Sequence, residues 1–159
     1  MPKTILPCCL FPTTFVIVDD DETFLNSLEL SLCVAGITVQ AFVEPKNALA
    51  FINSQQTLDL DDYYTTRVDI SDNHSVYDTQ ADLSAILKQL HNTERTKRLS
   101  VVISDYHMPQ INGLQLCTEI KSPSLKKVLL TSVASDYMAV SAFNDGTIDQ
   151  FIEKGQKAL

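Results

Sequence analysis

One stretch, Leu99–Leu116, constrains this chain more than any other, because a buried strand, a carboxylate and a sharp turn follow one another in it. Its apolar run, residues 101–103, is typical of a strand covered on both faces. The strand ends at Asp105, and Pro109 cannot continue it because proline has no amide hydrogen to donate. Gly113 supplies a permissive backbone before a short amphipathic helix. Ligands of parallel α/β sheets bind at the carboxyl ends of strands, so Asp105 is the first candidate for a functional site.

Composition limits the classes of function that this chain can have. Its 159 residues suit one domain with a real core, and a net charge of -8 argues against nucleic-acid binding by this segment. The four cysteines lack metal-ligand spacing, which favours free thiols in a reducing compartment and a cytoplasmic location. Three prolines interrupt the apolar residues 1–14, so we expect a surface arm there and no membrane helix or signal peptide.

Apolar runs alternate with amphipathic segments along the chain, which is typical of an α/β protein. We expect strands at residues 15–18, 38–42, 101–105, 127–130 and 148–152. We expect helices at residues 24–35, 45–52, 83–90, 114–120 and 136–143. The alternation predicts a doubly wound sheet of five parallel strands with helices on both faces.

Residues 54–98 interrupt this alternation before the third strand of the sheet, and we interpret them as an insert. We expect a loop over residues 54–79, because they are polar and acidic with few large aliphatic side chains. A variant capping box from Thr79 to Asp82 is expected to begin the insert's own helix. Our hypothesis is that this helix offers a surface to a partner.

Polar side chains follow the strands at one predicted edge of the sheet: Asp19, Asp20, Asp105, Thr131 and Lys154. Because the carboxyl ends of parallel strands meet at one edge, we expect these groups to lie close together. Clustered carboxylates repel one another, and a hard divalent cation such as Mg²⁺ removes the conflict. A lysine and a hydroxyl beside them suit a phosphoryl group. The edge therefore predicts phosphoryl transfer with a carboxylate as the nucleophile.

Four segments at these strand ends together closely resemble the receiver domain of bacterial two-component response regulators: Phe15–Asp21, Ser104–Gly113, Leu129–Ser132 and Phe151–Lys154. The resemblance covers residues 15–159 apart from the insert. It implies the flavodoxin-like or CheY-like strand order 2-1-3-4-5. It also implies a phosphorelay function, in which the domain takes a phosphoryl group from a sensor histidine kinase or a histidine phosphotransfer protein.

The resemblance implies a role for each acidic residue at the edge. Asp105 matches the aspartate that accepts the phosphoryl group, so we expect a signalling domain and no enzyme beyond its own phosphorylation and dephosphorylation. Asp20 would bind Mg²⁺ directly and Asp19 through water. The backbone carbonyl of His107 would be a further metal ligand.

The same resemblance implies a switch. Thr131 matches the hydroxyl that turns toward the phosphate, and Lys154 matches the lysine that pairs with its oxygens. Phe151 matches the aromatic side chain that swings inward when the hydroxyl moves. Phosphorylation would then bias an existing equilibrium and change an output surface.

The chain departs from the family pattern in three places. Gly155 follows the lysine where a proline in a cis bond is usual, so Lys154 is less preorganised. Phe151 replaces the commoner tyrosine. The last helix is truncated to residues 156–159, which indicates a fragment of a longer protein with a C-terminal effector domain beyond it.

Two alternative functions stay open. A pseudo-receiver would have this fold as an interaction module without phosphorylation. A phosphatase of the haloacid dehalogenase type would use Asp19 as nucleophile and Asp21 as acid and base, but it would leave Asp105 without a role.

Overall fold

The structure, a computed structural model, describes residues 14–55, 64–71, 74–84, 87, 97–122, 124–132 and 137–155. Residues 1–13 of the predicted arm and residues 156–159 of the predicted last helix lie outside this part. Thr14, which we expected in the arm, is instead the first residue of a strand. Among the described residues, no helix has the length and the hydropathy that crossing a membrane requires.

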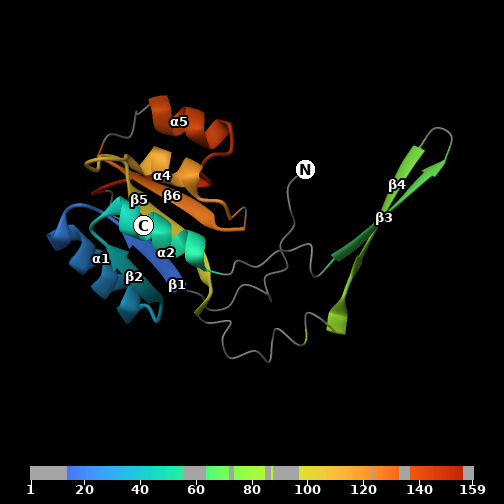
Figure 1. The fold of residues 1–159 in the computed structure, drawn as a ribbon, viewed down its shortest axis with the longest axis horizontal. Helices are drawn as coiled ribbons and strands as arrows, with labels where there is room; N and C mark the ends of the chain where they lie inside the picture. Colours follow the sequence, from blue (N-terminus) through green and yellow to red (C-terminus); the bar gives the residue numbers. More distant parts are fainter. Residues whose placement is uncertain are drawn as a thin grey trace.

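Five parallel strands form one sheet in the order β2-β1-β5-β6-β7, which confirms the predicted order 2-1-3-4-5 (Figure 1). The strands are β1 (Thr14–Val18), β2 (Thr38–Phe42), β5 (Leu99–Asp105), β6 (Lys126–Thr131) and β7 (Gln150–Glu153). Cross-strand pairs such as Val18 with Ser104 and Asp105 with Leu130 place the carboxyl ends of the three central strands at one edge. The register therefore assembles a common rim from segments that are far apart in the chain.

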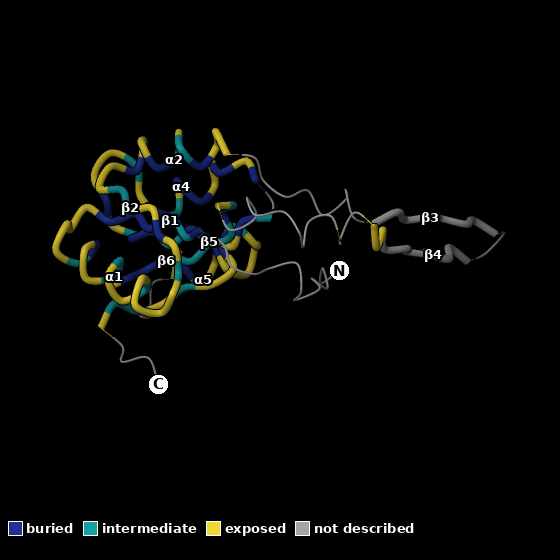
Figure 2. Tube along the Cα trace, turned by 90° about the horizontal axis from the view of Figure 1, so that it is seen from below, coloured by how far each residue is buried: buried dark blue, intermediate teal, exposed yellow. Residues whose placement is uncertain are grey.

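In the described part of the chain, four helices cover the two faces of the sheet: α1 (Glu22–Val34), α2 (Pro45–Ser54), α4 (Gly113–Glu119) and α5 (Tyr137–Asn144). The largest cluster of buried side chains joins the central strands to α2 and α4, as between Val102, Ile52 and Leu116. A second cluster joins α4, β6 and α5, and a third places Leu25 of α1 against Ile17 on the opposite face. Figure 2 shows the buried residues along the inner strands, with the exposed residues on the outer turns of the helices.

Local chemistry explains where the helices begin and end. The Asp21 side chain accepts hydrogen bonds from the amides of Thr23 and Phe24, at 2.9 and 3.2 Å, and so caps α1. Gly36, with a φ of 80°, ends that helix in the left-handed region that favours glycine. Pro45 stands in the first turn of α2, where its missing amide hydrogen costs nothing.

The predicted loop over residues 54–79 is wrong in its second half. Residues there form an antiparallel hairpin of β3 (Tyr64–Ser71) and β4 (His74–Ala81), paired in register from Tyr64 with Ala81 to Ser71 with His74. The segment alternates β-branched or aromatic residues with polar ones, and two residues separate its halves. Its acidic composition masked this strand pattern.

The predicted capping box is also wrong. Thr79 belongs to β4, and the cap is formed by the Asp82 side chain, which accepts a hydrogen bond from the Ser84 amide at 2.9 Å. Leu83, Ser84 and Leu87 are helical, and both leucines are exposed. The other residues of the predicted helix over 83–90 lie outside the described part.

The last strand starts at Gln150, two residues later than expected, because Ile148 is instead buried against Ala139 and Ala142 of α5.

Candidate functional site

Three carboxylates meet at the carboxyl edge of the sheet, as the sequence predicts. Asp19 and Asp20 follow β1, and Asp105 ends the neighbouring strand β5. Each offers an oxygen, and these oxygens all lie within 4.8 Å of one another. Asp19 and Asp105 are buried, with 2% and 4% of their surface exposed, whereas Asp20 is exposed. Such a set of hard oxygen donors, open to solvent on one side, suits Mg²⁺ or Ca²⁺.

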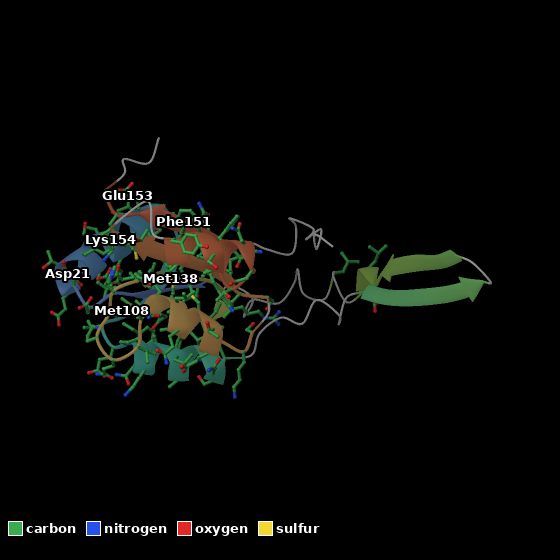
Figure 3. All side chains as sticks on the ribbon, turned by 90° about the horizontal axis from the view of Figure 1, so that it is seen from above. Asp21, Met108, Met138, Phe151, Glu153 and Lys154 are labelled. Carbon is green, nitrogen blue, oxygen red and sulfur yellow. The ribbon has the colours of Figure 1, made fainter. Side chains whose placement is uncertain are left out.

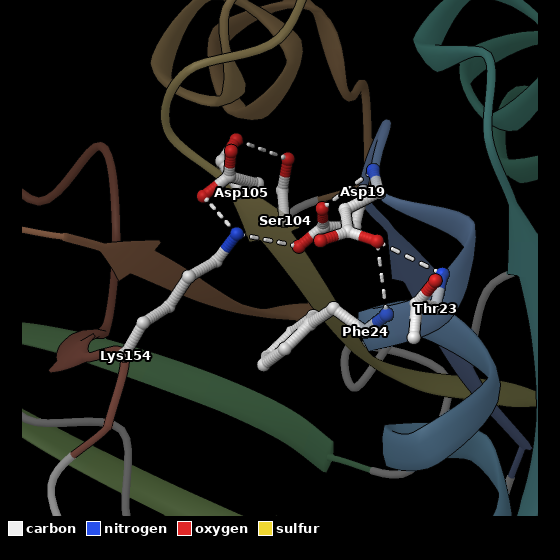
Figure 4. A network of polar contacts seen from close by, with 7 residues as sticks. Asp19, Thr23, Phe24, Ser104, Asp105 and Lys154 are labelled. Atoms are coloured by element: carbon white, nitrogen blue, oxygen red, sulfur yellow. Dashed lines mark hydrogen bonds and ion pairs between the residues drawn. The ribbon is translucent and has the colours of Figure 1, made fainter.

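The ammonium group of Lys154 lies between two of these carboxylates (Figure 4). Its Nζ is 2.8 Å from Asp19 Oδ2 and 2.8 Å from Asp105 Oδ1. The lysine follows β7, and its amide donates to the Thr131 carbonyl oxygen at 2.7 Å, which joins its backbone to the end of β6. Figure 3 shows Lys154 at the same end of the sheet as Asp21.

The site has more negative than positive charge. Within the described part of the chain, Asp19 Oδ2 and Asp105 Oδ1 accept no hydrogen bond of good geometry, although both lie in ion-pair distance of Lys154. Burial raises the pKa of Asp19, and this effect exceeds the lowering by Lys154 and by the Asp21 amide. Burial alone lowers the pKa of Lys154, but the neighbouring carboxylates of Asp105 and Asp19 outweigh this effect and raise the pKa. A divalent cation at the three carboxylates would supply the missing charge, so the residues present fit a metal.

The backbone around Asp105 is held by two residues whose roles are structural. A Cβ at Gly113 would lie 2.1 Å from the Asp105 carbonyl oxygen, so only glycine lets α4 begin this close to β5. We expected Gly113 to be needed for its backbone freedom, but its φ is not positive. The glycine is needed instead because there is no space for a side chain at this position. Ser104 is fully buried, and its hydroxyl donates to the Asp105 carbonyl oxygen at 3.1 Å. Sequence reasoning missed this contact.

The other predicted residues lie around the acidic cluster. Thr131 is fully buried at the end of β6, one residue after the partner of Asp105. His107 is exposed in the turn after β5, with its ring edge-on to that of Tyr106. Phe151 is half-buried on β7 and contacts α5, where its ring centroid is 6.2 Å from that of Phe143.

The strand order and the acidic edge define a class of protein, and the sequence comparison agrees with it. The sequence model of the response regulator receiver domain family matches residues 62–158, more than half of the chain. The chain therefore belongs to this family. The matched segment contains Asp105, Thr131 and Lys154, whereas the acidic pair after β1 precedes it. No curated protein sequence matches the chain.

Solved structures of response regulators resemble this fold along most of the chain. The response regulator LqsR of Legionella pneumophila is 33% identical, with a TM-score of 0.69 over 92% of this chain. The chain spans 39% of the LqsR chain. A response regulator receiver domain protein from Clostridium thermocellum is 18% identical, with a TM-score of 0.60 over 91% of this chain and 84% of its own.

A response regulator from Burkholderia pseudomallei also has this fold. It is 19% identical, with a TM-score of 0.58 over 91% of this chain and 61% of its own. That structure contains a phosphorylated aspartic acid, a calcium ion and citrate.

Proposed function

We propose that Asp105 accepts a phosphoryl group from a sensor histidine kinase or a histidine phosphotransfer protein. The observation that carries this proposal is the position of the Lys154 ammonium. Its Nζ lies 2.8 Å from one oxygen of Asp19 and 2.8 Å from one oxygen of Asp105. In the transfer, an Asp105 oxygen attacks phosphorus, and the donor's bond to phosphorus breaks with its electron pair leaving on the donor. The chain belongs to a family of signalling domains, and this reaction modifies the domain itself.

The acidic cluster is proposed to hold Mg²⁺. Asp20 would bind the ion directly, Asp19 through water, and Asp105 together with the His107 carbonyl would complete the protein's ligands. The support is that Asp19, Asp20 and Asp105 each offer an oxygen within 4.8 Å of the others, with one ammonium to balance them. When bound, the ion would neutralise charge on the phosphoryl oxygens.

The switch is proposed to involve Thr131 and Phe151. A phosphoryl group on Asp105 would bring acceptor oxygens close to the end of β6. These oxygens would favour rotation of the Thr131 hydroxyl toward the phosphoryl group. Phe151 pairs with β6 through Leu129, and its ring contacts Phe143 on α5. Movement at Thr131 would therefore reach the outer surface of α5, which exposes Tyr137 and Met138.

The wider setting of the domain is also a proposal. LqsR is much longer than this chain, so an effector domain joined to the receiver fits the comparison. We propose a cytoplasmic location, partners that carry a phosphorylated histidine, and no contact of this segment with nucleic acid or membrane.

Phosphorylation is tested by incubating the 159-residue protein with acetyl phosphate and Mg²⁺ and mapping the modified residue by mass spectrometry. We expect one phosphoryl group on Asp105, which Asp105→Asn abolishes and which removal of Mg²⁺ strongly reduces. The matched control Asp145→Asn removes an exposed carboxylate after α5 and should react like the wild type.

Two other results would favour the alternative functions. Turnover of p-nitrophenyl phosphate that Asp19→Asn abolishes would indicate a phosphatase. A folded protein that neither reacts with acetyl phosphate nor binds beryllofluoride would be a pseudo-receiver, and the proposed function would be wrong.

A further inference from the structure

The ammonium group of Lys154 has a third neighbour, which is the aromatic ring of Phe24 (Figure 4). The Nζ atom lies 4.6 Å from the ring centroid, within the range of a cation–π interaction. Phe24 is half-buried in the first turn of α1, and the Lys154 side chain is 21% exposed. The neighbours of this cation are therefore the carboxylates of Asp19 and Asp105 and the uncharged ring of Phe24.

The backbone of Phe24 is tied to the acidic cluster. Its amide donates to Asp21 Oδ1 at 3.2 Å, as part of the cap of α1. The Asp21 amide in turn donates to Asp19 Oδ1 at 3.0 Å, and the other oxygen of Asp19 contacts Lys154. These contacts form a closed circuit that returns to Lys154 through the ring of Phe24. The backbone that carries the ring is thus linked through Asp21 to Asp19, one of the two carboxylates that hold the cation.

Lys154 depends on side-chain contacts for its position because little else restrains it. Its amide bonds to the Thr131 carbonyl oxygen, but that contact leaves the long side chain free to rotate. Gly155 follows with a φ of 93°, and a Cβ there would meet nothing within 4 Å. The Lys154 side chain is partly exposed to water, and the ring of Phe24 covers one side of its ammonium.

We propose that Phe24 is a positioning residue that keeps the Lys154 ammonium over Asp105 during phosphoryl transfer. The inference rests on the proposed function of Asp105. The face of an aromatic ring attracts a cation without competing for its hydrogen bonds, and it excludes water from that side. A cation held in place stabilises developing charge without reorganising when the reaction occurs. Loss of the ring leaves the lysine present but less often in position.

The test compares variants that keep or remove the aromatic ring. Phe24→Leu keeps an apolar side chain, and we expect its rate of phosphorylation by acetyl phosphate to fall about three- to tenfold. Phe24→Trp keeps a ring face, and we expect a rate within about twofold of the wild type. The matched control Phe51→Leu removes a half-buried ring that packs on Phe42, and its rate should not change.

Nuclear magnetic resonance supplies a readout that does not depend on phosphorylation. The ring face should shift the ε-methylene protons of Lys154 upfield in the wild type and in Phe24→Trp, but not in Phe24→Leu. Unshifted protons in the wild type, or equal rates for Phe24→Leu and the wild type, would overturn the inference. A rate for Phe24→Trp as low as that of Phe24→Leu would also overturn it. If the wild type is not phosphorylated, the proposed function fails, and the proton shifts then decide whether Phe24 holds the cation.

Discussion

Gly113 shows how a single missing methyl group supports the site. The glycine begins α4, and its amide donates to the Tyr106 carbonyl oxygen at 3.1 Å. An added Cβ would approach the Asp105 carbonyl oxygen to 2.1 Å and Leu129 Cδ1 to 2.8 Å. The first of these neighbours is backbone of the central strand and cannot move cheaply.

We therefore predict that Gly113→Ala destabilises the protein by about 2–4 kcal/mol and slows phosphorylation of Asp105. Denaturant unfolding and reaction with acetyl phosphate measure the two effects. Gly146→Ala is the control, because its φ is 79° but a Cβ there meets nothing within 4 Å. It should cost about 1 kcal/mol of left-handed strain and leave the reaction unchanged. Equal losses for the two variants would contradict the steric explanation.

The buried thiol of Cys117 gives a prediction about pH. Burial raises its pKa to about 11 from an ordinary value of 9.0, with Asp149 adding to the effect and Lys127 opposing it. We expect the folded protein to be alkylated at exposed Cys33 and spared at Cys117 at about pH 8, as mapped by mass spectrometry. Denatured protein should react at both positions. Fast alkylation of Cys117 without unfolding would contradict this prediction.

The same shift implies a loss of stability in alkali. The folded state binds the Cys117 proton more tightly than the unfolded state does. The contribution of this thiol to the free energy of unfolding is therefore fully present below pH 9.0 and is lost as the pH rises toward 11. The loss at pH 11 should be about 2–3 kcal/mol for this group. Because other groups titrate in this range, the comparison is with Cys117→Ala, whose unfolding free energy should fall less steeply.

At the scale of elements, the hairpin of the insert forms no strand pairs with the five-stranded sheet. The strands β3 and β4 pair with each other in a separate two-stranded sheet, and α2 and β5 on either side of the insert belong to the main fold. The acidic edge is built from residues at the ends of β1, β5 and β7, so we expect it to form without the hairpin.

We predict that replacing residues 57–96 by a short glycine–serine linker leaves the rate of phosphorylation by acetyl phosphate unchanged within about twofold. Thermal unfolding should show the same cooperative transition as the intact chain. If our partner hypothesis is right, transfer from a phosphorylated partner should weaken although the reaction with acetyl phosphate does not. Loss of both reactions would show that the insert supports the site itself.

At the scale of the whole molecule, folding gathers negative charge at one edge of the sheet. Two strand ends contribute the carboxylates of Asp19, Asp20 and Asp105. Among the described residues of this cluster, Lys154 carries the only positive charge. In the unfolded chain, Asp105 is far from the adjacent pair Asp19 and Asp20, and all three carboxylates are in water. A cation that binds the gathered carboxylates will therefore bind the folded state in preference to the unfolded state.

We predict that Mg²⁺ at ten times its dissociation constant stabilises the protein by about 1.4 kcal/mol, which differential scanning fluorimetry would detect as a rise of a few degrees. Asp20→Asn should lose most of this rise because it removes a donor from the cluster. Asp145→Asn should keep it. An equal rise in all three proteins would indicate binding elsewhere.

Local signals in the sequence determined most of the sheet and the acidic edge. Apolar runs that end in aspartate, threonine or lysine identify buried strands and their carboxyl ends, and the rules of parallel sheets bring those ends together. Asp21 is of a residue type favoured at helix N-caps, and it caps α1 directly before an amphipathic run. The hairpin also has a local signal, the alternation within β3, which the acidic composition of the segment obscures.

Only the tertiary structure decided how the site is supported. The clash that excludes a side chain at Gly113, the Ser104 hydrogen bond and the ring of Phe24 over Lys154 have no periodic signature. A glycine before a helix has the same pattern whether it is needed for φ or for space. The contact between Phe24 and Lys154 joins opposite ends of the chain, and its distance follows from packing that no single segment encodes. Sequence periodicity reports which face of an element is buried, whereas contacts between particular atoms depend on all the elements at once.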